Sequence, residues 1–335
     1  MKALLLRILK QLKNDPRTLA LMLVAPFLIM SLIYLLLGDS DYRPVVATYD
    51  MPETFTEQLT VSAEVIAIAD TTFADTYLNA DSADAVIWQD GYELHIRVLE
   101  NNSKSTTAIQ AVQDALSELL PTGKITIQTI YGSQDDTYFT SMAYVFLAVL
   151  AFFFTFIVSG MALVRERFTN TLERLLMTPI HRWQVVGGYV CGYGVVAMLQ
   201  VVLIMLFTVY VLQVPVAGSI GLCLLVMLLL GICAVELGAL VSIFANGEFQ
   251  VAQFIPVIII PQIFFTGIIP LDMIPYGLGN LCYLMPMYYG AAPLKHIMQQ
   301  GAGFMDILPW LGGLLLFIVL LFVINTLSLK KYRKL

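Results

Sequence analysis

The chain is short of charge. Only 13% of its 335 residues are Asp, Glu, Lys or Arg, whereas a soluble domain carries about a quarter. Hydrophobic residues make up 59%, and the mean hydropathy is +0.80. In water such a chain would expose large apolar patches. The shortage of charge excludes an ordinary soluble protein and a disordered one, and it indicates a protein of the lipid bilayer.

The chain also lacks the sequence patterns of several kinds of structural or functional site. Its four cysteines all fall in the apolar second half, so no disulfide framework is expected. It has no Gly-x-x-x-x-Gly-Lys-Ser/Thr run to cradle ATP phosphates. We find no nucleophile–base–acid set and no metal-binding loop. We therefore expect a protein without catalytic residues, metal or cofactor of its own, and without a nucleic-acid partner.

Six apolar runs are long enough to span a bilayer, which takes about 20 residues. The first is followed by Gly38-Asp39-Ser40-Asp41 rather than by a small-residue cleavage site, so we expect it to remain as a membrane anchor. The predicted spans are Leu19–Leu37, Ser141–Val164, Val185–Leu212, Ile220–Phe244, Val251–Ile269 and Ile307–Leu327.

The positive charges indicate the orientation, since cytoplasmic loops are enriched in Lys and Arg. Thirteen of the 18 Lys and Arg residues fall on one side of a six-span topology, which we therefore take as cytoplasmic, with both termini inside. They are Lys2, Arg7, Lys10, Lys13, Arg17, Arg165, Arg167, Arg174, Arg182, Lys330, Lys331, Arg333 and Lys334.

Residues 39–138 form one large insertion on the other side. It holds 17 of the 24 acidic residues and four Lys or Arg. Its patterns predict a small α/β domain, with His95 as an ordinary strand residue. Gln89-Asp90-Gly91 predicts a hairpin turn. The expected strands are Val45–Thr48, Val61–Ala69, Ala83–Trp88, Tyr92–Leu99 and Ile125–Tyr131, and the expected helix is Ser105–Leu120.

Residues 1–16 predict an amphipathic helix. Lys2, Arg7, Lys10 and Lys13 share one arc, and leucine and isoleucine fill the opposite arc. Such a helix lies in the membrane interface. Two interpretations remain open, a simple topology anchor or an elbow helix that also contacts a cytoplasmic partner.

The loop between the second and third spans carries the most informative pattern. Leu172, Leu175 and Leu176 are spaced to form an apolar stripe, and Pro179 ends the short helix. Such a helix suits docking into a groove of another protein. An interfacial helix that contacts only lipid explains the same pattern equally well.

This loop resembles the signature of ABC type-2 exporter permeases. In that family a Glu-x-Gly-Thr-Leu-Glu-x-Leu-Leu-x-Thr-Pro-like run forms a coupling helix that sits on a separate ATP-binding subunit. Asn170 replaces the usual Gly, but Asn tolerates a left-handed backbone. The resemblance implies a coupling helix at about 166–182. Its residues would be Glu166, Thr171, Leu172, Glu173, Arg174, Leu175, Leu176, Thr178, Pro179 and Arg182.

Two further stretches resemble the same family. Asp15–Leu19 with Pro26 is similar to its entry to the first span, and residues 263–290 are similar to its outer re-entrant hairpin. We therefore expect an all-α polytopic membrane protein of six transmembrane helices, with an inserted α/β extracytoplasmic domain between helices one and two. The expected parts are an elbow helix at 1–16, a first transmembrane helix at 17–38, the inserted domain at 39–138 and a five-helix transmembrane domain at 139–335.

Glu236 is the one acid deep within a predicted span. Intramembrane acids are costly and default to a functional hypothesis, but a hydrogen-bonded structural role is equally open. By resemblance, the second and fifth spans border the translocation path. The candidate path residues are Phe152, Phe156, Glu236, Phe254, Gln262 and Phe265.

Together these features predict the permease subunit of an ABC exporter in the bacterial plasma (inner) membrane. It would move an amphipathic drug, peptide antibiotic or lipid out of the cytoplasm or inner leaflet. Its partners would be an ATPase subunit that carries ATP and Mg, a second copy or a sister permease, and the lipid bilayer. The alternatives are a membrane sensor or assembly protein with a ligand-binding outer domain, and an ion-coupled secondary transporter.

Overall fold

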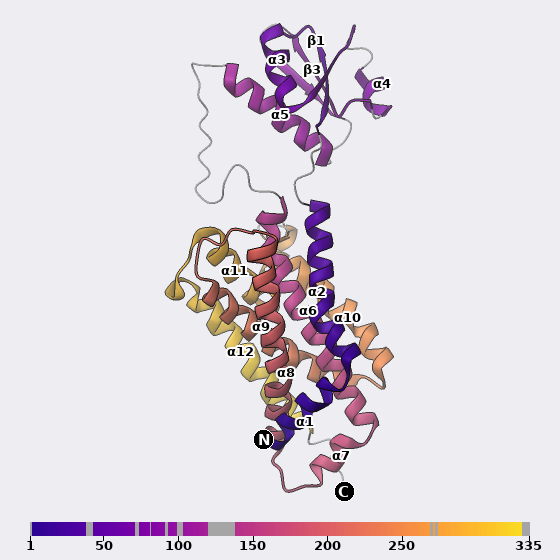
Figure 1. Ribbon diagram of the computed structural model, residues 1–335, viewed down its shortest axis with the longest axis vertical. Coiled ribbons are helices and arrows are strands. Elements are labelled where there is room, and N and C mark those ends of the chain that lie inside the picture. Colours follow the sequence, from indigo (N-terminus) through magenta and orange to yellow (C-terminus); the bar gives the residue numbers. More distant parts are fainter. Residues whose placement is uncertain are drawn as a thin grey trace. The chain divides into compact units, whose positions relative to one another are not determined.

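The computed structural model describes residues 2–37, 43–70, 74–80, 82–90, 93–98, 103–119, 138–268, 271 and 274–329. The chain divides into two compact units. Residues 39–129 form one, here called the sheet unit, and residues 1–38 with 130–335 form the other, the helical unit (Figure 1). The tail lysines and Arg333, and the strand expected at Ile125–Tyr131, lie outside the described residues.

The sheet unit is a four-stranded sheet in the order β2-β1-β3-β4. Strand β1 pairs in parallel with β2 and β3, and β4 runs antiparallel to β3. The strands are β1 (Val45–Tyr49), β2 (Glu64–Ala67), β3 (Ala85–Asp90) and β4 (Glu93–Arg97), and the helices are α3 (Glu53–Ser62), α4 (Ala74–Asn79) and α5 (Ser103–Leu119).

Apolar side chains of the strands form two clusters, one on each face of the sheet, because successive side chains point to opposite faces. Val46 and Ile87 pack on one face with Phe55 of α3 and Val112 of α5. The opposite face packs against α4, through Ala47, Val86, Ala74 and Leu78. The short α4 thus covers one face and the pair α3 and α5 covers the other.

The strands expected at Val45–Thr48, Ala83–Trp88 and Tyr92–Leu99 and the helix at Ser105–Leu120 are confirmed within a few residues. The strand expected at Val61–Ala69 is too long, because Val61 belongs to α3 and only Glu64–Ala67 pair. Phe55 and Leu59, four residues apart, are the buried face of α3. That spacing is the helical signal the strand prediction missed.

The helical unit contains six helices long and apolar enough to cross a membrane, among the described residues. Each overlaps one of the six predicted runs, so the prediction of a polytopic helical membrane protein is confirmed. These helices are α2 (Pro16–Leu37), α6 (Tyr138–Phe168), α8 (Arg182–Leu206), α9 (Ile220–Phe244), α10 (Glu248–Ile263) and α12 (Phe304–Ser328). All four cysteines are free, as expected.

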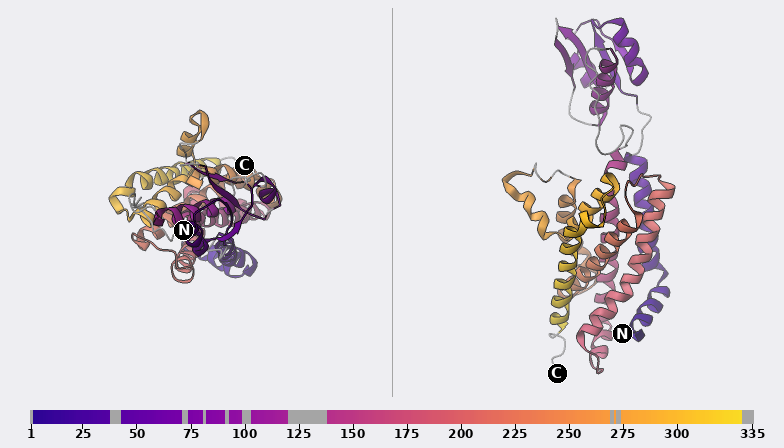
Figure 2. Two further views of the ribbon diagram at one scale, coloured as in Figure 1. Left: turned by 90° about the horizontal axis from the view of Figure 1, so that it is seen from above. Right: turned by 90° about the vertical axis from the view of Figure 1, so that its left-hand side faces the viewer.

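Shorter elements complete this unit. Helix α1 (Lys2–Lys13) precedes α2, and α7 (Thr171–Leu176) lies between α6 and α8. A π-helical turn, η2 (Phe207–Val211), follows α8. Between α10 and α12 lie another π-helical turn, η3 (Phe264–Ile268), a 3-10 segment, η5 (Pro275–Leu284), and α11 (Tyr288–Gln300). In both views of Figure 2 the orange η5 segment projects from the side of the helices.

The ends of the helices define two sides of this unit. One side, here called the basic end, holds α1, the α6–α7–α8 connection and the start of α10. Leu329 shares a buried cluster with Leu4 and Ile8, so the last described residue lies at this end together with α1. The other side, here called the far end, holds the start of α6 and the η3–η5–α11 segment.

Helix α6 is the most deeply buried of the six, and its most extensive contact among the described elements is with α9. A Cβ atom on Gly238 would lie 2.4 Å from Ser159 Oγ and 2.8 Å from the Phe156 carbonyl oxygen. The two backbones approach so closely that no side chain fits, as is common where membrane helices pack on small residues.

Gly238→Ala should therefore destabilise the helical unit by about 1–3 kcal/mol, because a backbone carbonyl has to move to admit the methyl group. The midpoint of thermal unfolding of the purified chain in detergent measures this. Gly194→Ala is the matched control, since its Cβ would meet nothing closer than Ile232 Cγ1 at 3.9 Å. Equal midpoints for the two variants would contradict the tight crossing.

Candidate functional site

The short helix α7 at the basic end follows a left-handed turn. Helix α6 ends at Phe168, and Asn170 then adopts φ 54° and ψ 18°. This is the conformation that glycine favours and that asparagine tolerates better than most residues. The expectation that Asn170 preserves the turn is confirmed, and Thr171–Leu176 follow as one helical segment.

Two of the leucines predicted for docking face the chain's own interior. Leu172 and Leu176 are 4% and 7% exposed. They share a buried cluster with Leu4 and Ile8 of α1 and with Tyr189 of α8. Leu175 is half-buried against the same cluster. The apolar contacts of these leucines are therefore made within the chain, in a cluster to which α1 and α8 also contribute.

A different set of side chains faces solvent. Glu173, Arg174, Thr178 and Pro179 are exposed, Thr171 and Arg182 are half-buried, and Met177 is 71% exposed. Phe168 and Trp183, on either side of α7 in the sequence, are also exposed. A hollow beside α7 is lined by Arg167, Phe168, Asn170, Leu172 and Glu173. The exposed set mixes apolar and charged groups, as protein interfaces do. We call Phe168, Glu173, Arg174, Met177, Thr178 and Trp183 the docking patch.

Glu166 lies inside the basic end, away from the docking patch. Its side chain is 3% exposed, and Arg7 Nη2 of α1 donates to Glu166 Oε1 at 3.0 Å. The Tyr189 hydroxyl of α8 donates to the other carboxylate oxygen. A buried carboxylate requires such partners. Glu166 therefore ties three helices together, α1, α6 and α8.

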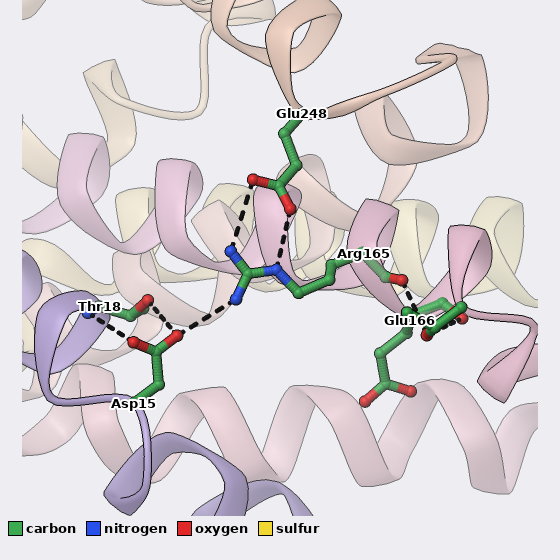
Figure 3. A network of polar contacts seen from close by, with 6 residues as sticks. Asp15, Thr18, Arg165, Glu166 and Glu248 are labelled. Carbon is green, nitrogen blue, oxygen red and sulfur yellow. Dashed lines mark hydrogen bonds and ion pairs between the residues drawn. The ribbon is translucent and has the colours of Figure 1, made fainter.

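Arg165 forms a second polar junction, which the sequence did not single out (Figure 3). Its Nε donates to Glu248 Oε1 at 2.9 Å, at the start of α10. Its Nη1 donates to Asp15 Oδ2 at 3.3 Å. The Thr18 amide and hydroxyl donate to the same carboxylate at 3.2 and 2.7 Å, so Asp15 caps the start of α2. These bonds, with a smaller contribution from Arg165, lower the pKa of Asp15.

Arg167 joins the end of α6 to the end of α9. Its Nη1 donates to the carbonyl oxygens of Ser242 and, at 3.3 Å, of Ala245. The last carbonyls of a helix have no partner within the helix, so a cation there is favourable. Arg165 and Arg167 together connect the last turn of α6 to the ends of α2, α9 and α10. The last turn of α6 leads directly into α7.

The candidate path residues do not line an open channel within a single chain. Phe152 and Phe156 are fully buried, with ring centroids 6.3 Å apart. Gln262 is buried and accepts a hydrogen bond from the Met287 amide at 3.3 Å. Phe254 and Phe265 of the α10–η3 region are half-buried. Phe152, Phe156 and Gln262 are thus buried by packing within the chain.

Glu236 of α9 is fully buried and faces Asn325 of α12. Asn325 Nδ2 donates to Glu236 Oε2 at 2.6 Å and to its backbone carbonyl at 2.9 Å. Glu236 Oε1 and Asn325 Oδ1 are both buried without a hydrogen-bond partner. The pair thus joins α9 to α12 and leaves two oxygens unsatisfied. Over the described residues, no group of three or more His, Cys, Asp or Glu side chains has the arrangement of a metal site.

Comparison with known proteins gives the chain its relatives. The family model described as "ABC-2 family transporter protein" matches residues 16–327. "Probable multidrug ABC transporter permease YbhR" of Escherichia coli strain K12 is 29% identical over 147 residues, which are 44% of this chain and 40% of that protein. "Inner membrane transport permease YhhJ" of the same strain is 27% identical over 155 residues, 46% and 41% of the two chains.

A eukaryotic relative is more distant. "ABC transporter G family member 20" of Dictyostelium discoideum is 22% identical over 207 residues, 59% of this chain and 28% of that protein. The matched segments thus cover about two-fifths of the length of the bacterial relatives and less of the Dictyostelium protein.

The Arg7–Glu166 pair makes a prediction for stability. Arg7→Ala leaves the Glu166 carboxylate buried without its cation, which should cost about 2 kcal/mol or more. The Arg7→Ala/Glu166→Gln double variant should recover part of this loss, since no buried charge remains. Thermal unfolding of the detergent-purified chain measures both. Arg17→Ala, which removes an exposed cation at the start of α2, should change stability by about 0.5 kcal/mol or less. An equally small loss of stability for Arg7→Ala would contradict the stabilising role of the Arg7–Glu166 ion pair.

Glu236→Gln tests the role of the intramembrane acid. An amide at position 236 can still accept from Asn325 and also offers a donor to Asn325 Oδ1. We expect the thermal unfolding midpoint to be unchanged or higher, whereas Glu236→Leu should lower it by removing the acceptor. Transport with normal expression is the second readout. Loss of transport in a stably folded Glu236→Gln protein would assign the acid to the mechanism instead.

Proposed function

The chain belongs to the ABC-2 transporter family, and from this premise we propose that it is the membrane permease subunit of an ATP-driven exporter. A separate ATPase subunit binds ATP and Mg and hydrolyses the nucleotide, since this chain has no P-loop sequence. The permease supplies the membrane path and the surface on which the ATPase sits.

The docking patch around α7 is the observation that carries this proposal. A short helix is fixed to the chain's interior by Leu172 and Leu176, while Glu173, Arg174 and Met177 face outward. An exposed methionine among charged residues suits a protein groove, because the flexible thioether fills irregular gaps. The hollow beside Phe168 and Asn170 gives room for one partner side chain.

The anchoring of α7 explains how movement of an ATPase would reach the membrane. A push on α7 is carried through Leu172 and Leu176 into α1 and α8, because packed side chains transmit strain. The Arg7–Glu166–Tyr189 contacts hold α1, α6 and α8 together during that movement. Arg165 extends the connection to α2 and α10, two of the three spans that are least buried within the described part of the chain.

The distribution of charge supports one orientation. We place the basic end in the cytoplasm, and the enrichment of Lys and Arg in cytoplasmic loops supports this placement. The acidic sheet unit, inserted between α2 and α6, is then extracytoplasmic. A bacterial inner membrane is the setting suggested by the names of the two Escherichia coli relatives.

The proposal extends to the cargo and the number of permease chains. An amphipathic cargo, such as a drug, peptide antibiotic or lipid, suits a path bordered by apolar helices, and we propose export from the cytoplasm or inner leaflet. A second copy or a sister permease completes the path, because Phe152 and Phe156 are packed within one chain. An ion-coupled mechanism rests on Glu236 alone, which Asn325 already engages.

Met177→Asp tests the docking patch. A charge at the centre of an apolar contact should remove the ATPase from the complex when the permease is purified from its native host in mild detergent. The mass spectrum of the wild-type sample should contain a protein with a P-loop, and that of the variant should lack it. The ATP-hydrolysis rate of the sample should fall in parallel.

Met305→Asp is the matched control. Met305 is 77% exposed, like Met177, but it lies at the start of α12 at the far end. It should leave the ATPase bound. Retention of the ATPase in both variants, or the absence of any P-loop protein from the wild-type sample, would contradict the proposal.

A further inference from the structure

A cavity at the far end of the helical unit contains the ammonium group of Lys295, with which no Asp or Glu among the described residues pairs. It has a volume of about 640 Å³ and lies between α6, η3, η5 and α11. Its polar lining includes Tyr144, Asn280, Tyr283, Tyr288, Lys295 and His296. We call it the far cavity. We propose that it binds the anionic group, phosphate or carboxylate, of an amphipathic molecule.

Lys295 is out of place for a residue that only sets topology. Every other Lys or Arg that the structure describes in the helical unit lies at the basic end, and a cation at the other side opposes the positive-inside distribution. The Lys295 ammonium lies 6.0 Å from the centre of the Tyr144 ring. Within the described part of the chain no Asp or Glu pairs with it. An anion entering the cavity would pair with this ammonium group.

The wall next to Lys295 is held in a fixed arrangement. The His296 ring lies against Trp310 of α12, with centroids 4.8 Å apart, and its Nδ1 is hydrogen-bonded to Gln300 Oε1. This bond fixes the ring orientation and leaves Nε2 as its remaining polar atom. Tyr283 and Tyr288 pack edge to face at 5.7 Å. Ordered polar side chains lose little entropy when a ligand binds.

The surroundings favour an amphipathic ligand over a free inorganic ion. Tyrosines present an apolar ring and a polar hydroxyl, which suits a boundary between a charged group and a chain. The η5 segment at the cavity rim exposes Leu278, Leu281 and Leu284. An alkyl chain can lie along these leucines while its headgroup meets Lys295. Two kinds of molecule carry such an anionic group on an alkyl chain, a phospholipid of the outer leaflet and an anionic cargo.

The test uses the full chain in nanodiscs of neutral phosphatidylcholine, with Trp88→Phe and Trp183→Phe so that Trp310 is the remaining tryptophan. Titration with dodecyl phosphate should change Trp310 fluorescence saturably, and the neutral dodecyl maltoside should not. Lys295→Gln should weaken dodecyl phosphate binding about tenfold to a hundredfold, the range for a charge-assisted hydrogen bond. Lys295→Arg should retain binding.

Lys13→Gln, which removes an exposed cation at the basic end, is the matched control and should bind like the wild type. Thermal unfolding checks that each variant is folded. Nanodiscs of mixed phosphatidylcholine and phosphatidylglycerol distinguish the two sources. If a lipid headgroup occupies the site, dodecyl phosphate binds more weakly there; if cargo is the source, its affinity is unchanged.

Equal affinity for dodecyl phosphate and dodecyl maltoside would overturn the proposal, as would a folded Lys295→Gln variant that binds like the wild type. The assay contains neither ATP nor an ATPase. Its failure therefore leaves the docking proposal untouched, and failure of docking leaves this site untouched.

Discussion

A carboxylate removed from water has to meet a cation or hydrogen-bond donors, and Glu166 meets both at the basic end. Arg7 comes from the amphipathic helix α1 and Tyr189 from the membrane helix α8. Glu166 thereby fixes an amphipathic helix against two spans. The buried leucines of α7 fill the same cluster. The position of α7 depends on this combination of one buried acid and a few apolar contacts.

Two glycines of α8 make the packing of α1 possible. A Cβ atom on Gly188 would lie 2.3 Å from Leu4 Cδ2, and one on Gly192 would lie 2.8 Å from Ile8 Cγ2. The apolar arc of α1 is thus buried against protein, while Lys10 and Lys13 remain exposed. Both sequence interpretations of this helix had placed it in the membrane interface. The structure adds that α1 belongs to the same packed block as the proposed coupling helix.

Sequence reasoning succeeded where the signal was local. The six spans follow from the length of apolar runs, and the turn at Asn170 follows from what one residue type tolerates. The ion pairs of Arg165 were not predicted, because their partners are far away in the sequence: Glu248 lies 83 residues from Arg165 and Asp15 lies 150 residues from it. The spacing of Leu172 and Leu176 correctly predicted an apolar stripe. Spacing alone does not distinguish burial against a partner from burial against the chain itself.

The most direct test is a photoreactive amino acid at position 177 in living cells of the native host. Irradiation captures whatever lies against that side chain without disturbing the complex. The account predicts one crosslinked protein that bears a P-loop, and no such product from the same probe at position 305. Crosslinking of position 177 to lipid alone, or of both positions to the same proteins, would contradict the claim that α7 carries the ATPase.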